Sequence, residues 1–186
     1  MKNIKNVVYY SILTGLCVVP FIPFIVPSTM FFPFITGKGF TFRIVVEIIF
    51  GLYALLALYS PEYRPKDSWI TRAVLAFTAV IFLADIFGQN PYKSYWSNYE
   101  RMEGFVLTFH LLLYYIVVSS VLDISNWKKY LNLSIFASGL MSLYGIFQVL
   151  GKATINQGGV RIDATFGNAS YFAIYLVVNI FLHPHK

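Results

Sequence analysis

Two uncharged stretches decide the fold class: VVYYSILTGLCVVPFIPFIV at residues 7–26 and LNLSIFASGLMSLYGIFQVL at residues 131–150. Each is twenty residues long, and roughly 20 apolar residues in a helix cross the ~30 Å hydrocarbon core of a bilayer. The first stretch follows Lys2 and Lys5, as a signal peptide would, but it contains Pro20 and Pro23 and lacks a small-residue cleavage site. We therefore expect two transmembrane helices, the first of them uncleaved.

Three further apolar stretches each contain a single acidic residue or histidine. They are residues 44–59 with Glu47, residues 73–87 with Asp85 and residues 105–122 with His110, and flanking residues bring each to spanning length. Residues 171–182 are apolar but only twelve long, about 18 Å of helix. The sequence predicts an all-α polytopic membrane protein with about five full transmembrane helices and a truncated sixth, which form a single membrane domain over residues 1–186.

The composition weighs against other classes of protein. With 58% hydrophobic and 12% charged residues, a soluble helical protein would lack the polar surface to face water. The formal charge is +6, but the basic residues are scattered through the loops, so we expect no nucleic acid as a partner. Cys17 is the only cysteine, which excludes an intrachain disulfide or a cysteine-based metal site, and we expect no metal or cofactor.

The loops differ in length and chemistry between the two sides of the membrane. If the N-terminus is cytoplasmic, eight Lys and Arg residues lie inside and six outside, which favours that orientation. The inner loops 61–69 and 123–130 are short connectors, whereas the outer loops 27–41, 88–104 and 151–170 are longer and rich in polar and aromatic residues. Function is therefore expected on the outer side.

The polar groups within the spans lie toward the same outer side. Arg43 and Glu47 open the second span, Asp85 closes the third, and His110 is about two turns into the fourth. Polar groups in spans usually line a bundle interior or a wet cavity, so we predict a cavity open to the outer face, with Arg43 and His110 binding substrate.

Each of these residues also has a simpler interpretation. Arg43 and Glu47 are four residues apart and could neutralise each other. His110 could be a neutral hydrogen-bond partner between helices, and Asp85 could be solvated at the interface. Four aromatic residues of the loop 88–104 fit either an interfacial belt or a platform for sugars: Tyr92, Tyr95, Trp96 and Tyr99.

Two local patterns go beyond what a membrane protein requires: SYWSNYERMEGF at residues 94–105 and RIDATFGNASY at residues 161–171. In the second, Gly167 permits a sharp turn, and Asn168 or Ser170 can cap a helix that begins near Tyr171. A helix N-terminus presents free N–H groups and a partial positive charge, and Arg161 adds a planar guanidinium suited to phosphate. The pattern predicts a diphosphate site at the membrane surface.

These residues resemble a known family. Glu100 and Arg101 before a Gly at the mouth of a span, then Arg161, Thr-Phe-Gly-Asn and a helix with Ala173, resemble the O-antigen ligase and O-antigen polymerase superfamily over residues 94–182. The resemblance implies a glycosyltransferase of the bacterial cytoplasmic membrane that moves glycan from undecaprenyl diphosphate to an acceptor at the outer face. It needs neither a metal nor a nucleotide sugar.

The resemblance also implies partners and roles. The partners are a lipid-linked glycan donor, a glycan or lipid acceptor such as a lipid A core sugar, and membrane lipids. Arg161 would stabilise the departing diphosphate and Arg101 would order the outer cavity, which makes these two the catalytic residues. Gly167 and Asn168 would shape the loop, and Glu100 joins the substrate-binding residues.

The chain departs from the family at two places. Ala169 and Ser170 stand where the family usually has Pro-Asn, and nothing after Leu182 resembles the further spans and the outer loop with the His assigned as catalytic base. We therefore expect this chain to be the N-terminal part of a larger enzyme and inactive alone. The rival classes are a small transporter, which would show internal repeats or interrupted helices, and a non-catalytic membrane subunit.

Overall fold

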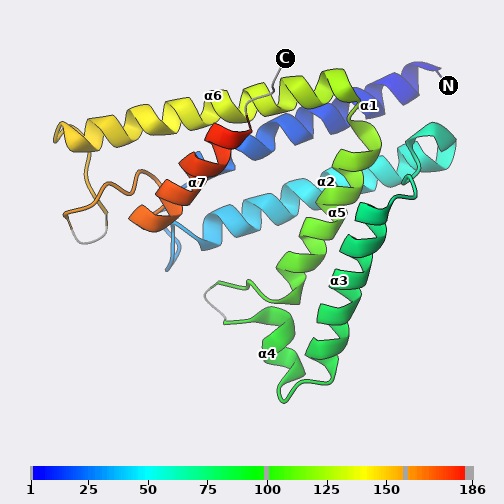
Figure 1. Cartoon of the computed structure of the whole chain (residues 1–186), viewed down its shortest axis with the longest axis horizontal. Helices are drawn as coiled ribbons and strands as arrows, with labels where there is room; N and C mark the ends of the chain where they lie inside the picture. Colours follow the sequence, from blue (N-terminus) through cyan, green and yellow to red (C-terminus); the bar gives the residue numbers. More distant parts are fainter. Residues whose placement is uncertain (1, 99–100, 157–158, 183–186) are drawn as a thin grey trace. The chain divides into compact units, whose positions relative to one another are not determined.

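The computed structural model describes residues 2–98, 101–156 and 159–182, and the described chain is helical without a β-strand. This confirms the predicted all-α class for that part of the chain. The elements follow in the order α1 (Lys2–Val18), η1 (Val19–Phe24), α2 (Thr36–Tyr59), η2 (Pro61–Tyr63), α3 (Trp69–Ile86), α4 (Pro91–Trp96), α5 (Phe105–Val121), α6 (Ile124–Val149) and α7 (Ala169–Phe181) (Figure 1).

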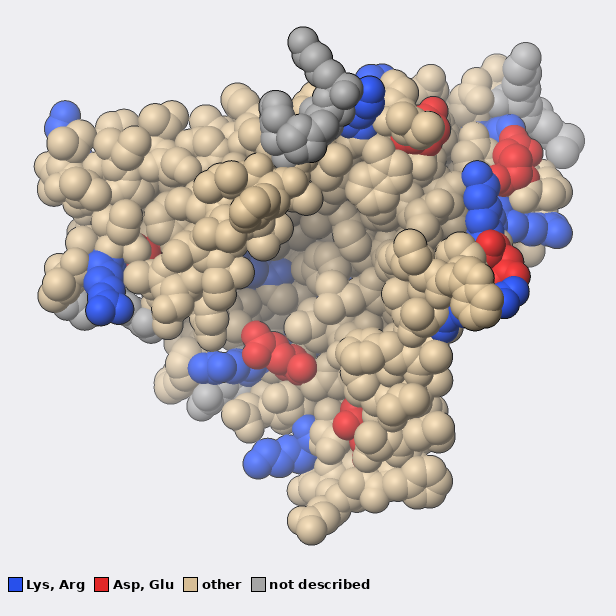
Figure 2. All heavy atoms as spheres, in the orientation of Figure 1, with Lys and Arg blue, Asp and Glu red and all other residues tan. Residues whose placement is uncertain are grey.

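Four helical segments of the described chain are long and apolar enough to cross a membrane: Asn3–Phe24, Thr36–Tyr59, Trp69–Ile86 and Ile124–Val149. Their apolar side chains are mostly exposed. In α3, for example, Thr78 is the only buried residue. The face in Figure 2 is largely tan, which marks residues other than Lys, Arg, Asp and Glu. Because lipid rather than water suits such a surface, the protein is a multi-pass membrane protein by length and composition.

The predicted count of five full spans is not confirmed. Helix α5 has 17 residues, about 26 Å of helix against a ~30 Å hydrocarbon core. Helix α7 has 13 residues and is short, as the sequence predicts. Within the described ranges, the structure therefore supports four spanning helices and two shorter apolar ones.

Two helices begin earlier than predicted. Helix α2 starts at Thr36, inside the predicted outer loop 27–41. Lys38 and Arg43 mark the end of the apolar run, but Lys and Arg are good helix formers and do not end the helix. Residues 123–130 are predicted to be a short inner connector. This prediction is wrong, since α6 begins at Ile124. Asp123 caps it, with its Oδ1 accepting from the Asn126 N–H at 2.7 Å.

The chain divides into two compact units, which are described separately. Unit one contains residues 1–16 and 39–122. Helices α1 and α2 approach closely at Gly15, where an added Cβ would lie 2.3 Å from Ile49 Cγ2. Helix α5 contacts α2 through the Tyr53 hydroxyl, 3.2 Å from Ser120 Oγ, and α3 through Thr71 Oγ1, 3.1 Å from the Tyr115 hydroxyl.

Unit two contains residues 17–38 and 123–186. Helix α7 packs beside α6, as Figure 1 shows, with the Phe172 ring against Gly145 and the Ser134 hydroxyl 2.8 Å from Asn179 Oδ1. Met141 and Ala164 are fully buried in the same apolar cluster as Phe172. This cluster attaches the connection between α6 and α7 to both helices.

Candidate functional site

The connection between α6 and α7 in unit two is held by a buried polar centre at Gln148 and Asp163. The two side chains are 3% and 1% exposed, and Gln148 Nε2 donates to Asp163 Oδ1 and to the Thr154 carbonyl, both at 2.8 Å. Gln148 Oε1 accepts from the N–H groups of Asp163 and Ala164 at 3.2 and 2.8 Å. The Asn156 N–H also donates to the Asp163 carboxylate at 3.2 Å. The described residues of this loop on both sides of the gap at 157–158 are therefore anchored to the end of α6.

The end of this loop has the predicted turn and cap. Gly167 has φ +65°, a conformation that favours glycine. Helix α7 begins at Ala169, and the N-cap residue Asn168 accepts the Ser170 N–H at 2.8 Å. Between the two predicted cap candidates, the structure selects Asn168, and Ser170 lies in the first turn.

Residues 17–38 support the same loop from the other part of unit two. The Thr165 hydroxyl donates to the Pro23 carbonyl at 2.7 Å, and Lys38 Nζ donates to the Thr165 carbonyl and lies 4.9 Å from the Phe166 ring centroid. A Cβ added to Gly167 would lie 2.6 Å from the Phe34 ring. Two of the predicted outer loops, 27–41 and 151–170, therefore meet in unit two.

Arg161 begins this fixed segment and is exposed. It lies two residues before the buried Asp163 and seven before the cap of α7. An exposed guanidinium on an anchored loop can bind an anion with little rearrangement of the backbone.

Lys38 and Gln148 are the residues of this site that the sequence interpretation misses. Lys38 is separated from Thr165 by 127 positions, so no local pattern connects them. Gln148 had a weak signal, because it is the only glutamine in the uncharged stretch 131–150.

The second group of predicted site residues lies in unit one. His110 is 8% exposed, its Nε2 is 3.0 Å from Glu47 Oε1, and its Nδ1 is 2.6 Å from the Val106 carbonyl oxygen. Arg43, one turn before Glu47, is 6% exposed. Its Nε donates to the Gly39 carbonyl at 3.3 Å, and its Cζ lies 4.4 Å from the Phe40 ring centroid.

Arg101 is exposed in the segment before α5, and its N–H donates to the Asn98 carbonyl at 3.1 Å. Met102 follows with φ +50°. Gly104 packs tightly, since an added Cβ would lie 2.4 Å from the Ser94 and Tyr95 carbonyl oxygens. The predicted substrate residue Glu100 lies outside the described residues.

The predicted site residues thus form two groups, one in each unit. Arg161, Gly167 and Asn168 share a loop in unit two, and Arg43 and His110 share the α2–α5 contact in unit one. The predicted cavity that joins all of them stays a prediction.

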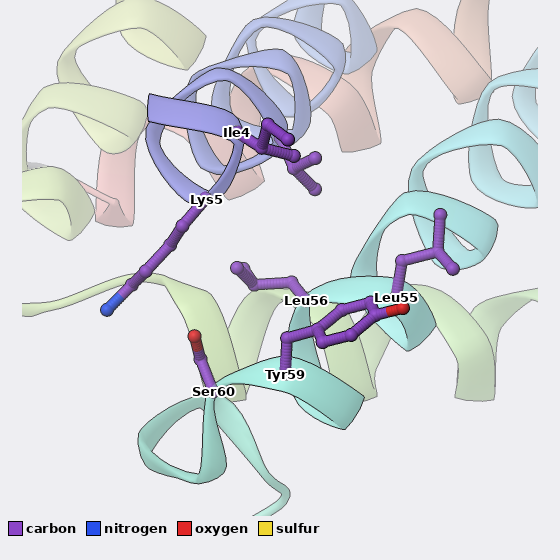
Figure 3. Close-up of a pocket in the computed structure, with 7 residues that line it drawn as sticks. Ile4, Lys5, Leu55, Leu56, Tyr59 and Ser60 are labelled. Atoms are coloured by element: carbon purple, nitrogen blue, oxygen red, sulfur yellow. The ribbon is translucent and has the colours of Figure 1, made fainter. Parts of the chain in front are cut away.

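A cavity in unit one lies at the opposite end of α2 from Arg43 (Figure 3). It measures about 330 Å³ and has mostly apolar walls from α1 and α2, with Lys5 and Ser60 at its polar side. Lys5 pairs with Glu62, and this hydrogen bond lowers the pKa of the Glu62 carboxyl below its usual range. None of the predicted site residues lines this cavity.

In the described ranges, no group of three or more His, Cys, Asp or Glu side chains could hold a metal ion. No protein-family model, no curated protein and no solved structure matches this chain. The function therefore has to be inferred from the residues and their geometry.

Proposed function

We propose that this chain forms the donor-binding part of a membrane glycan transferase of O-antigen ligase type. The donor is a glycan linked to undecaprenyl diphosphate, and the acceptor is a glycan or lipid at the outer face of the bacterial cytoplasmic membrane, with the N-terminus inside. Residues 161–168 and the start of α7 bind the diphosphate.

The observation that carries the proposal is the anchored loop between α6 and α7. The Gln148–Asp163 centre and the contacts of Lys38 and Pro23 fix the backbone on which Arg161 is presented. At the other end of this segment, Asn168 caps the 13-residue helix α7. The N-terminus of a helix favours negative charge. This anchored segment thus carries a cation, Arg161, and a helix N-terminus, and both favour the binding of a phosphate group.

The chemistry explains why these elements would matter for catalysis. In glycan transfer, the acceptor oxygen bonds to the anomeric carbon of the donor sugar and loses its proton, while the bond between that carbon and the diphosphate oxygen breaks. The electron pair of that bond goes to the diphosphate, whose negative charge increases. A fixed guanidinium that interacts more strongly with this leaving group than with the intact donor lowers the barrier.

Arg101 and Arg43 have supporting roles in this proposal. Arg101 precedes α5, and Arg43 lies in α2, seven residues after its first residue, Thr36. The predicted topology places both toward the outer face, where Arg101 would order the mouth of the predicted cavity. Substrate binding by Arg43 and His110 stays a prediction from the sequence. These roles rest on the resemblance and the predicted topology.

The first experiment measures donor binding by the purified chain in phosphatidylcholine nanodiscs, with farnesyl diphosphate as a short probe of the carrier. Arg161→Ala removes a charge-assisted contact to phosphate, which is worth about 1.5–3 kcal/mol. We expect Kd to rise roughly tenfold to a hundredfold, with partial recovery in Arg161→Lys. The matched control is Lys152→Ala, which removes an exposed cation from the same connection.

The second experiment follows transfer of radiolabelled glycan from the lipid-linked donor in membranes that contain the intact protein. Arg161→Ala should abolish most of the acceptor-dependent product, whereas Lys152→Ala should not. Unchanged binding and transfer in Arg161→Ala would reject the proposed site and favour a non-catalytic subunit or a small transporter.

A further inference from the structure

The cavity between α1 and α2 in unit one has walls that suit an apolar group. Its volume is about 330 Å³, which is at the lower end of the range for small-molecule sites. The apolar walls come from Ile4 and Val8 of α1 and from Leu55, Leu56 and Tyr59 of α2 (Figure 3). The cavity can therefore hold a small apolar molecule or part of a longer apolar chain.

The two polar residues of the cavity lie at the ends of the helices. Lys5 is the fourth residue of α1, which begins at Lys2, and Ser60 directly follows the last residue of α2. Val8 and Leu55 lie three and five residues farther into the same helices, a depth of roughly 5–8 Å. An occupant would therefore have its polar part at the helix ends and its apolar part between the helices, as a membrane lipid does.

The Ser60 hydroxyl provides a buried donor in this cavity. Ser60 is 5% exposed, and its hydroxyl makes no hydrogen bond to another of the described residues. Figure 3 shows this hydroxyl pointing toward the space between Lys5 and Leu56. Because buried hydroxyl groups normally have a partner, the cavity lacks an acceptor that a ligand can supply.

Lys5 and Glu62 add one charge of each sign beside this donor. The Lys5 ammonium donates to Glu62 Oε1, and both side chains are partly exposed. An ammonium has three donors and a carboxylate accepts several hydrogen bonds, so each group can bind a second partner. Opposite charges side by side complement a ligand that also carries one charge of each sign.

We propose that the cavity binds one phospholipid whose headgroup carries a phosphate and a primary ammonium, as in phosphatidylethanolamine. The upper part of an acyl chain would lie between Val8 and Leu55. The phosphate would accept from Lys5 and from the Ser60 hydroxyl, and the ammonium would donate to Glu62. A purely anionic headgroup fits less well, because the Glu62 carboxylate repels it. None of the residues assigned to glycan transfer lines this cavity, so the inference goes beyond the transferase proposal.

The first experiment compares three phospholipids with the same dioleoyl chains by native mass spectrometry of the full chain in detergent micelles. The probes are phosphatidylethanolamine, phosphatidylcholine, whose quaternary ammonium has no N–H to donate, and phosphatidylglycerol, whose headgroup has no cation. Because Lys5 and Glu62 are partly exposed, phosphatidylethanolamine should bind roughly threefold to tenfold more tightly than the other two. Equal affinities of the three lipids would overturn the proposed headgroup.

Charge variants separate this recognition from a folding defect. Glu62→Gln removes the carboxylate and leaves Lys5 unpaired, so the preference should reverse in favour of phosphatidylglycerol. Misfolding would weaken all three lipids and cannot produce this reversal. Lys5→Ala should weaken phosphatidylethanolamine roughly threefold to tenfold, Lys5→Arg should restore it, and the control Lys66→Ala, at an exposed position, should bind like the wild type. An unchanged preference in Glu62→Gln would refute the role of the ion pair.

A matched pair of variants on α1 tests the cavity itself. Val8→Trp fills the cavity and should weaken all three lipids roughly tenfold or more. Val7→Trp is the control, because Val7 is 64% exposed and does not line the cavity. Ser60→Ala leaves the cavity open and should weaken phosphatidylethanolamine roughly threefold. Equal affinities of Val7→Trp and Val8→Trp would show that the lipid binds elsewhere and would overturn the proposal.

Discussion

Replacing Gln148 with leucine should release the loop between α6 and α7 from its anchor. The substitution keeps the approximate volume of the side chain but removes both groups that bind the loop. Asp163, which is 1% exposed, would lose its amide donor, and the N–H groups of Asp163 and Ala164 would lose their acceptor. Buried polar groups without partners are the main source of the expected destabilisation.

The magnitude follows from the four shortest hydrogen bonds of the Gln148 side chain, at 2.8, 2.8, 3.2 and 2.8 Å. One bond to a charged acceptor contributes about 1.5–3 kcal/mol, and three neutral ones contribute about 0.5–1.5 kcal/mol each. Because the loop can open and let water replace some of these bonds, we expect a loss near the lower end of the sum, about 3 kcal/mol. That value corresponds to roughly a hundredfold faster amide exchange through local opening.

The assay is hydrogen exchange followed by mass spectrometry on the chain in nanodiscs, read at the amides of Asn156, Asp163 and Ala164. Gln89→Leu is the control, because Gln89 is an exposed amide in unit one and its loss should change the free energy of unfolding by less than about 0.5 kcal/mol. Wild-type protection of these amides in Gln148→Leu would refute the anchored-loop interpretation.

Three further predictions follow from single contacts. Gly167→Ala should lower the free energy of unfolding by about 2–4 kcal/mol, because φ is +65° and the new Cβ would lie 2.6 Å from the Phe34 ring. Adding Phe34→Ala should restore part of this loss. The control Gly139→Ala, whose Cβ would meet nothing within 4 Å, should leave the free energy of unfolding unchanged or raise it. Tyr53→Phe should lower the unfolding free energy by about 1 kcal/mol, since its hydroxyl lies 3.2 Å from Ser120 Oγ and 3.1 Å from the Tyr63 carbonyl, and an unchanged melting temperature would contradict this. The hydrogen bond from Lys5 lowers the pKa of Glu62 below its ordinary 4.5. The Glu62 carboxylate therefore stabilises the fold above pH 4.5, and this contribution is lost as the pH falls through the lowered pKa. The melting temperature measured against pH should show this acid step in the wild type and lack it in Glu62→Gln.

Local features of this fold were predictable from the sequence because their causes are local. The uncharged residues 131–150 indicate a spanning helix, and Gly167 followed by Asn168 indicates a turn and a cap, which the structure has at these positions. The helix ends were less predictable. Lysine and arginine mark the end of an uncharged stretch but are good helix formers, so α2 and α6 extend beyond the stretches that identify them.

Contacts between distant segments could not be predicted. Lys38 and Thr165 are separated by 127 positions, and Glu47 and His110 by 63, and a single sequence carries no signal for such pairs. The same limit applies to the partner of Glu47. The spacing of Arg43 from Glu47 indicates an ion pair on one helix, whereas the contact with α5 gives the Glu47 carboxyl a different partner.

The sequence predicts that the loops 27–41, 88–104 and 151–170 lie on one face of the membrane. We would measure it directly by placing single cysteines at Ser28, Ser97 and Thr154 in a Cys17→Ser background and labelling cells with a membrane-impermeant maleimide. Cysteines at Ser68 and Asn126 serve as markers of the opposite face. The account predicts that the first three positions label together from outside and that the two markers label only after the membrane is permeabilised. Labelling of Ser97 with the markers rather than with Ser28 and Thr154 would contradict it, because the predicted topology would then be wrong.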